Sequence, residues 1–158
     1  MLRRAVFLAF SIAAVSGPIS PAHAAHKGFG VRAGFSIDPD QVVLGGHYVI
    51  SAGDVPILTW VLPVVELGLG DDITVLTVGT DLQVRPFKNI NGWELYGGGE
   101  LAINYYNFDG GNETDLGVMA LVGIDKDVSG NRTLGFELKV DLVDSPDLKF
   151  LVTYTFGR

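Results

Sequence analysis

The side chains best able to do chemistry in this chain are charged groups of both signs that share one face of several extended segments. Successive side chains of a strand point to opposite faces, so residues two positions apart lie on the same face. The set comprises Arg32, His47, Glu66, Asp81, Arg85, Glu94, Glu100, Asp125, Glu137, Lys139, Asp141 and Lys149. Because an unpaired buried charge is costly, we expect these groups to neutralise one another in ion pairs and hydrogen bonds. A narrow ion or proton path through the same groups is the alternative.

A catalytic site is not indicated by these residues. A hydrolase needs Ser, His and an acid within hydrogen-bond reach. We predict that Ile37 pairs with Val42 around the first turn. His47 then lies opposite Arg32 and about 13 Å from Ser36, at ~3.3 Å per residue. We therefore predict that the protein is not an enzyme and needs no cofactor; without cysteine it has no thiolate chemistry either.

Carboxylates gather in four of the connections between the extended segments. These connections hold no Lys or Arg, and their acidic residues are Asp38, Asp40, Asp71, Asp72, Asp109, Glu113, Asp115, Asp144 and Asp147. Oxygen ligands suit Ca²⁺ and Mg²⁺, so Asp71, Asp72, Asp109 and Asp115 are weak candidates for metal ligands. Turns favour Asp for its own hydrogen bonds, and no calcium-loop spacing is present, so we predict no dedicated metal site. Divalent cations could still bridge this acidic rim to lipopolysaccharide.

The segment that closes the chain, residues 148–156, has two different faces. One face carries Phe150, Val152, Tyr154 and Phe156; the other carries Lys149, Thr153 and Thr155, with Leu151 as its one apolar residue. The same alternation recurs along the chain, in segments 29–37, 42–50, 57–69, 76–85, 93–106, 116–124 and 134–142. Eight alternating segments joined by turns predict an all-β, antiparallel, up-and-down barrel.

Two stretches interrupt this regularity. Pro63 cannot donate a hydrogen bond to a neighbouring strand, so we expect a bulge or a late strand start there. Residues 107–115 are polar and rich in Asn, Asp and Gly, and we predict that they form the longest loop.

The first 24 residues have the features of a secretory signal peptide. Arg3 and Arg4 precede an apolar run from Ala5 to Val15, and Ala22-His23-Ala24 fits a cleavage signal. We therefore expect residues 1–24 to be removed and residues 25–158 to form the exported barrel domain. Removing Arg3 and Arg4 changes the formal net charge from −7 to −9, which excludes nucleic acid as a natural partner.

The apolar face is predicted to lie outside the barrel. An eight-stranded barrel has an interior that is just filled by side chains, and the aromatic residues of the apolar face would overfill it. Glycines are frequent on the polar face, as a crowded lumen requires. The alternative is a soluble periplasmic barrel whose apolar face lines a cavity for a hydrophobic ligand.

The closing segment and the stretch Tyr96-Gly97-Gly98-Gly99-Glu100-Leu101-Ala102-Ile103-Asn104-Tyr105-Tyr106 carry a family resemblance. The chain resembles the small, eight-stranded, porin-like β-barrel proteins of the bacterial outer membrane. The resemblance implies a transmembrane barrel in the outer membrane of a Gram-negative cell, inserted by the barrel-assembly machinery. It also implies contact with outer-membrane lipid and lipopolysaccharide, and a structural or surface-interaction role with at most narrow solute or ion conductance.

Overall fold

A computed structural model describes residues 27–53, 58–85, 90–128 and 130–157 of the protein. The eight strands are β1 (Lys27–Ile37), β2 (Gln41–Ser51), β3 (Leu58–Leu69), β4 (Ile73–Val84), β5 (Trp93–Phe108), β6 (Gly111–Val128), β7 (Arg132–Val143) and β8 (Leu148–Phe156). Within the described ranges, no helix is long and apolar enough to cross a membrane. The predicted signal peptide lies outside the described residues and stays a prediction.

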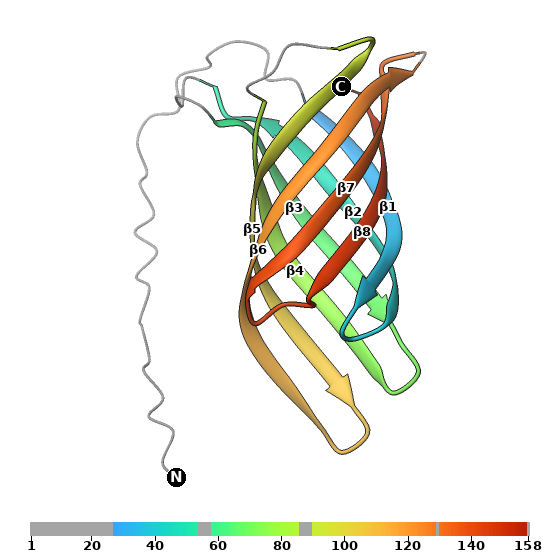
Figure 1. The fold of residues 1–158 in the computed structure, drawn as a ribbon, viewed down its shortest axis with the longest axis vertical. Coiled ribbons are helices and arrows are strands. Elements are labelled where there is room, and N and C mark those ends of the chain that lie inside the picture. Colours follow the sequence, from blue (N-terminus) through green and yellow to red (C-terminus); the bar gives the residue numbers. More distant parts are fainter. Residues whose placement is uncertain (1–26, 54–57, 86–89, 129, 158) are drawn as a thin grey trace.

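Each strand pairs antiparallel with the next one along the chain, and β8 pairs with β1, so that the sheet closes into a barrel (Figure 1). The predicted all-β, eight-stranded, antiparallel up-and-down architecture is therefore confirmed. The turns after β1, β3, β5 and β7 lie at one end, which we call the acidic end. The C-terminus lies at the opposite end, which we call the C-terminal end.

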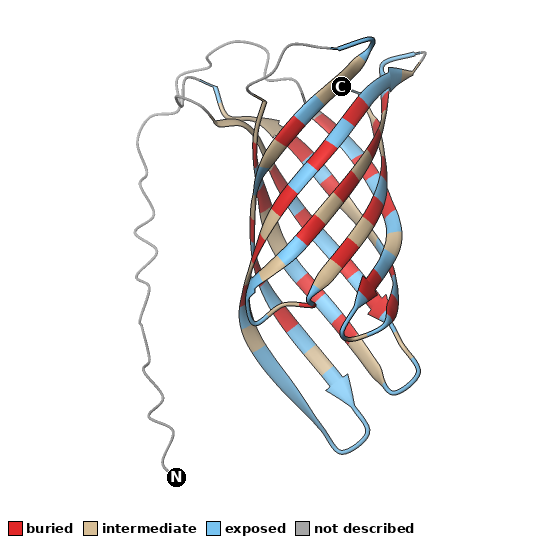
Figure 2. Cartoon of the chain, viewed as in Figure 1, coloured by how far each residue is buried: buried red, intermediate tan, exposed pale blue. Residues whose placement is uncertain are grey.

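Side chains alternate between the lumen and the outer surface along every strand (Figure 2). In β8 the buried residues are Lys149, Leu151, Thr153 and Thr155, and the residues between them are Phe150, Val152, Tyr154 and Phe156. The same sorting holds around the barrel, where large apolar side chains are exposed on the outside and charged side chains are buried. The placement of all these groups follows from the alternation of side chains along a strand, which has a period of two residues.

Strand β3 departs from the prediction at Pro63. The strand begins at Leu58, and Pro63 lies exposed inside it, opposite Thr80 of β4. The expected bulge at Pro63 is wrong, because the β2–β3 register is the same on both sides of this residue. Proline removes one donor from the ladder without adding a residue, so the register does not change. The irregularity of β3 lies instead between Leu58 and Trp60.

The predicted loop at residues 107–115 is also wrong. Strands β5 and β6 continue to a turn of two residues, Asp109 and Gly110, and they pair up to Phe108 and Gly111. Gly110 has a φ of 125°, a conformation that residues with a side chain rarely adopt. This hairpin projects farther than any other at the acidic end (Figure 1).

The register of β1 and β2 differs by two residues from the predicted one. Ser36 pairs with Gln41, and Val42 pairs with Phe35 instead of with Ile37. The Ser36 hydroxyl donates to the Pro39 carbonyl at 2.8 Å, which ties the turn to the end of β1. A shift of two residues keeps every side chain on its predicted face, because the period is two.

Closure between β1 and β8 depends on a glycine. A Cβ at position 34 would lie 2.9 Å from Leu151 Cα and closer still to the Phe150 carbonyl, both of which are backbone. At Gly46, on the outer face of β2, a Cβ would meet only the Gly30 carbonyl, at an ordinary 3.5 Å.

We expect Gly34→Ala to destabilise the folded barrel by about 1–3 kcal/mol, because the backbone of the β1–β8 seam must move. Gly46→Ala is the matched control and should change stability by less than about 0.5 kcal/mol. Urea unfolding in detergent, followed by tryptophan fluorescence, measures both. Equal effects of the two substitutions would show that the seam is not tightly packed.

Candidate functional site

The centre of the lumen is built around one buried ammonium group. Lys139 of β7 is fully buried, and its Nζ lies 2.8 Å from Asp81 Oδ1 and in contact with Glu100 Oε2. The carboxylates of Glu66 and Glu137 lie 3.6 Å from the same nitrogen. Four carboxylates from β3, β4, β5 and β7 therefore converge on Lys139.

Two further cations complete this cluster. Arg32 of β1 places Nη1 2.8 Å from Glu66 Oε1 and 3.1 Å from Asp81 Oδ2. Lys149 of β8 places Nζ 2.9 Å from Glu66 Oε2. We call these seven side chains the lumen plug: Arg32, Glu66, Asp81, Glu100, Glu137, Lys139 and Lys149.

The lumen plug links six strands across the barrel, and most of its partners are far apart in the sequence. Its charges are removed from bulk water, so their stability depends on the opposite charges that surround them. With four carboxylates and three cations interleaved, removal of any member leaves others uncompensated. The plug therefore closes the lumen and holds opposite walls of the barrel together.

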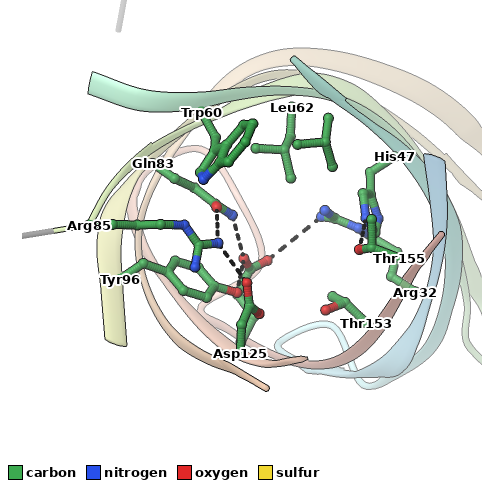
Figure 3. A pocket seen from close by; sticks show the side chains of 12 residues that line it. Arg32, His47, Trp60, Leu62, Gln83, Arg85, Tyr96, Asp125, Thr153 and Thr155 are labelled. Carbon is green, nitrogen blue, oxygen red and sulfur yellow. Dashed lines mark hydrogen bonds and ion pairs between the residues drawn. The ribbon is translucent and has the colours of Figure 1, made fainter. Parts of the chain in front are cut away.

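A second cluster lies toward the C-terminal end and is centred on Arg85 (Figure 3). Arg85 Nη2 lies 2.6 Å from Asp125 Oδ2, and Nη1 lies 3.1 Å from Glu94 Oε2. The guanidinium carbon is 4.6 Å from the centre of the Tyr96 ring, a cation–π distance. Tyr96 Oη donates to Glu137 Oε2 at 3.0 Å, which connects this cluster to the lumen plug.

A small cavity lies between the two clusters and has an apolar wall of Val49, Trp60 and Leu62 (Figure 3). Its volume is about 20 Å³, room for one water molecule. Arg32 also lines it, and its Nε and Nη2 have no hydrogen-bond partner among the described residues, which suits a bound water. A carrier of hydrophobic ligands would need a large apolar cavity here, and the described lumen has charged groups instead.

His47 does not form part of a catalytic arrangement. Its Nε2 shares a hydrogen bond of 2.8 Å with the Thr155 hydroxyl, and Ser36 is bonded to the Pro39 carbonyl near the acidic end. His47 pairs across the β1–β2 ladder with Gly30, not with Arg32, so the predicted opposition of His47 and Arg32 is wrong. In the described part of the chain, no hydrogen bond or ion pair joins His47 to a carboxylate.

The structure places the predicted lumen residues at three levels. Seven form the lumen plug: Arg32, Glu66, Asp81, Glu100, Glu137, Lys139 and Lys149. Arg85, Glu94 and Asp125 form the cluster toward the C-terminal end, and His47 lines the cavity between the two clusters. Asp141 lies apart from the plug at the acidic end, where Oδ1 accepts a hydrogen bond from the Ser145 amide at 3.1 Å.

Three of the four weak metal candidates lie together. Asp71, Asp72 and Asp109 line an open hollow of about 210 Å³ at the acidic end, whereas Asp115 is on β6 and does not line it. Across the described ranges, no group of three or more His, Cys, Asp or Glu residues is arranged to hold a metal ion. Divalent cations at this rim stay a prediction.

The sequence analysis did not single out the apolar wall of the cavity. Trp60, Leu62 and Val64 share the inward face of β3 with Glu66, and counting back from Glu66 in steps of two would have found them. Gln83 was not singled out either; its Oε1 accepts a hydrogen bond from Arg85 Nη2 at 3.1 Å.

The outer surface of the closing strand carries aromatic contacts. Phe156 stacks on Phe29 with ring centres 5.2 Å apart, and Tyr154 meets Phe156 edge-on at 4.9 Å. Toward the acidic end, Phe150 lies 5.5 Å from Phe35. Val152, between the two groups, is exposed. The four predicted outward residues of β8 thus form one apolar surface with β1.

Comparison with solved structures shows the same architecture. The chain is similar to Neisserial surface protein A, with a TM-score of 0.62 and 12% identity over 86% of this chain and 100% of that one. It is also similar to the de novo designed protein TMB2.3, with a TM-score of 0.50 and 15% identity over 87% of this chain and 98% of that one. The outer membrane protein Ail of Yersinia pestis, solved in a phospholipid bilayer nanodisc, has a TM-score of 0.50 and 9% identity over 82% of this chain and 97% of that one.

These likenesses show a shared fold. No protein-family model matches the chain, and no curated protein matches it.

Removal of the central ammonium tests the lumen plug. We expect Lys139→Met to lower the free energy of unfolding by about 3–5 kcal/mol, because Asp81, Glu100 and Glu137 lose a buried partner. Lys126→Met removes an exposed Lys that lies 5.4 Å from the Trp93 ring and should cost about 0.5–1 kcal/mol. Adding Glu100→Gln to Lys139→Met should restore part of the loss. Urea unfolding in detergent measures all three, and an equal effect of the two Lys substitutions would contradict the plug.

Proposed function

We propose that this protein is a non-enzymatic β-barrel of the outer membrane with a closed lumen and a surface-interaction role. The observation that carries the proposal is the inverted sorting of side chains. Fully buried charges such as Lys139 and Asp81 fill the inside, and exposed apolar residues such as Leu44, Val65 and Val78 cover the outside. In water this outer surface would be a large apolar patch, which soluble monomers rarely have.

The dimensions of the wall suit a bilayer. Strands β1 to β4 and β7 have 11–12 residues. At ~3.3 Å per residue and a tilt of about 40°, such strands rise about 28 Å along the barrel axis, close to the ~25 Å apolar band of membrane barrels. Aromatic side chains lie on the outer wall near both ends of β1, where Phe29 contacts Phe156 and Phe35 contacts Phe150 of β8. The likeness in fold to Ail, solved in a bilayer, supports the same environment.

The two ends of the barrel differ in charge, which supports an orientation. We place the C-terminal end in the periplasm and the acidic end at the cell surface, because the long β5–β6 hairpin, which extends beyond the rest of the barrel, is at the acidic end. Outer-membrane lipid would contact the wall, lipopolysaccharide would meet the acidic rim through divalent cations, and the assembly machinery would recognise β8.

The lumen plug supports a limited role in transport. Eight strands leave an interior filled by side chains, and here the filling is ionic and interlocked. Solutes larger than water have no path through the described lumen without side-chain movement. Any conductance would be small and would require the ion pairs of Lys139 to open.

Mobility on gels tests the proposed location directly. Isolated outer membranes should contain the protein, and unboiled samples in SDS should migrate differently from boiled ones because the folded barrel resists the detergent. We expect Val78→Arg, at the middle of the outer face, to weaken or abolish the unboiled band, at a cost of about 2–4 kcal/mol in a bilayer.

Ile90→Arg is the matched control for Val78→Arg. Ile90 is 64% exposed and Val78 is 50% exposed. Ile90 lies at the C-terminal end, where it pairs with Trp93, and arginine near the end of a membrane barrel costs only about 0–1 kcal/mol. Recovery of the protein from the soluble periplasm, with no mobility shift, would overturn the proposal.

A further inference from the structure

The projecting hairpin has an unpaired strand edge. β6 pairs with β7 only from Val118 onward, where its partner is Val143, the last residue of β7. Residues 111–117 of β6 pair with β5 on one side and with no described strand on the other. Figure 2 shows that most of this part of the hairpin is exposed; Asp115 is half-buried, and Gly117 is buried beside Asp144 and Ser145. An exposed edge presents free backbone donors and acceptors to another extended chain.

The side chains beside this edge are acidic on one face. Glu113 lies opposite Tyr106, and Asp115 lies opposite Asn104, which is a buried lumen residue. Residues directly opposite in a ladder share a face, so both carboxylates are on the lumen side of the sheet. Tyr106 joins them there, and its hydroxyl donates to the Asp144 carbonyl at 3.4 Å.

The other face of the same edge is uncharged. Thr114 lies opposite Tyr105, and Leu116 lies opposite Ile103; Leu116 is 65% exposed. A strand added to this edge would therefore meet carboxylates on one face and β-branched, aromatic and aliphatic groups on the other.

We propose that the free edge of β6 at residues 111–117 binds an extended, basic segment of another protein by strand addition. The favoured segment alternates Lys or Arg, facing Glu113 and Asp115, with β-branched or apolar residues, facing Thr114 and Leu116. The inference rests on the proposed surface role and names the class of partner. The ring of Tyr106, next to Glu113, could also form a cation–π contact with a Lys or Arg of the bound segment.

Charge distinguishes this partner from a second copy of the same chain. Pairing two β6 edges would bring two sets of Glu113 and Asp115 together, and like charges across a ladder are destabilising. The four connections at the acidic end hold no Lys or Arg that could compensate. A basic partner relieves the repulsion among these carboxylates.

The test uses the full chain refolded in detergent and two synthetic peptides. One is a ten-residue peptide of alternating Lys and Thr; the other has the same residues with every internal amide N-methylated. The two carry the same charge, but the second lacks backbone donors. Fluorescence anisotropy should show at least about tenfold weaker binding for the methylated peptide, since strand addition depends on main-chain hydrogen bonds.

Protein variants distinguish binding at the β6 edge from a general attraction of the basic peptide to the acidic end. Glu113→Gln with Asp115→Asn should weaken binding of the Lys-Thr peptide about fivefold or more, because two opposite-charge pairs across the ladder are lost. Asp38→Asn with Asp40→Asn makes the same change in charge at another turn of the same end and should change binding less than twofold.

Equal binding of the two peptides, equal effects of the two double variants, or self-association of the protein instead of peptide binding would each overturn the inference. These outcomes are distinct from failure of the proposed location. A protein that shows a folded, heat-modifiable band in the outer membrane but does not bind the peptide refutes the edge site alone. Absence from the outer membrane refutes the location, whatever the peptide result.

Discussion

The structure depends on the neutralisation of buried charge inside a closed sheet. An ammonium or carboxylate taken out of water is stable only where opposite charges and hydrogen bonds replace the lost hydration. Lys139 meets this condition through four carboxylates, and Arg32 and Lys149 balance most of the remaining negative charge. Such a cluster requires strands on opposite walls to be in register, because its members come from six of the eight strands.

The same constraint accounts for the outer surface. With polar groups occupying the lumen, the alternation of each strand sends its apolar residues outward, and no second layer within the described ranges covers them. Such a surface is poorly solvated by water, which agrees with the proposed membrane location. The charged lumen and the apolar outer surface therefore both follow from the alternation of polar and apolar residues in the sequence.

Most of the fold could be predicted from that pattern, because the period of two survives local errors. The β1–β2 register was predicted two residues away from the observed one, yet Arg32 and His47 still face the lumen. Partner choice within the lumen could not be predicted in the same way. Whether Lys139 meets Asp81 or Asp141 depends on register and strand tilt across the barrel, and neither is visible in local periodicity.

Two predictions about local structure were wrong because they did not include contacts between strands. Polar composition at residues 107–115 predicted a loop, but pairing of β5 with both β4 and β6 extends the sheet to Phe108, so that these residues form a hairpin. At Pro63 the lost donor predicted a bulge, whereas the neighbouring residues keep the register. In both places contacts between strands outweigh local preference. The first of these errors concealed the free edge of β6.

The central claim is that charged side chains fill the inside and lipid covers the outside. The chain has no cysteine, so single cysteines can be placed at Val78, which faces out, and at its neighbour Thr77, which faces in. Each is labelled with a small fluorophore before folding into vesicles whose acyl chains carry spin-label quenchers. The account predicts strong quenching at position 78 and little at position 77. Strong quenching at position 77 with protection at position 78 would contradict it.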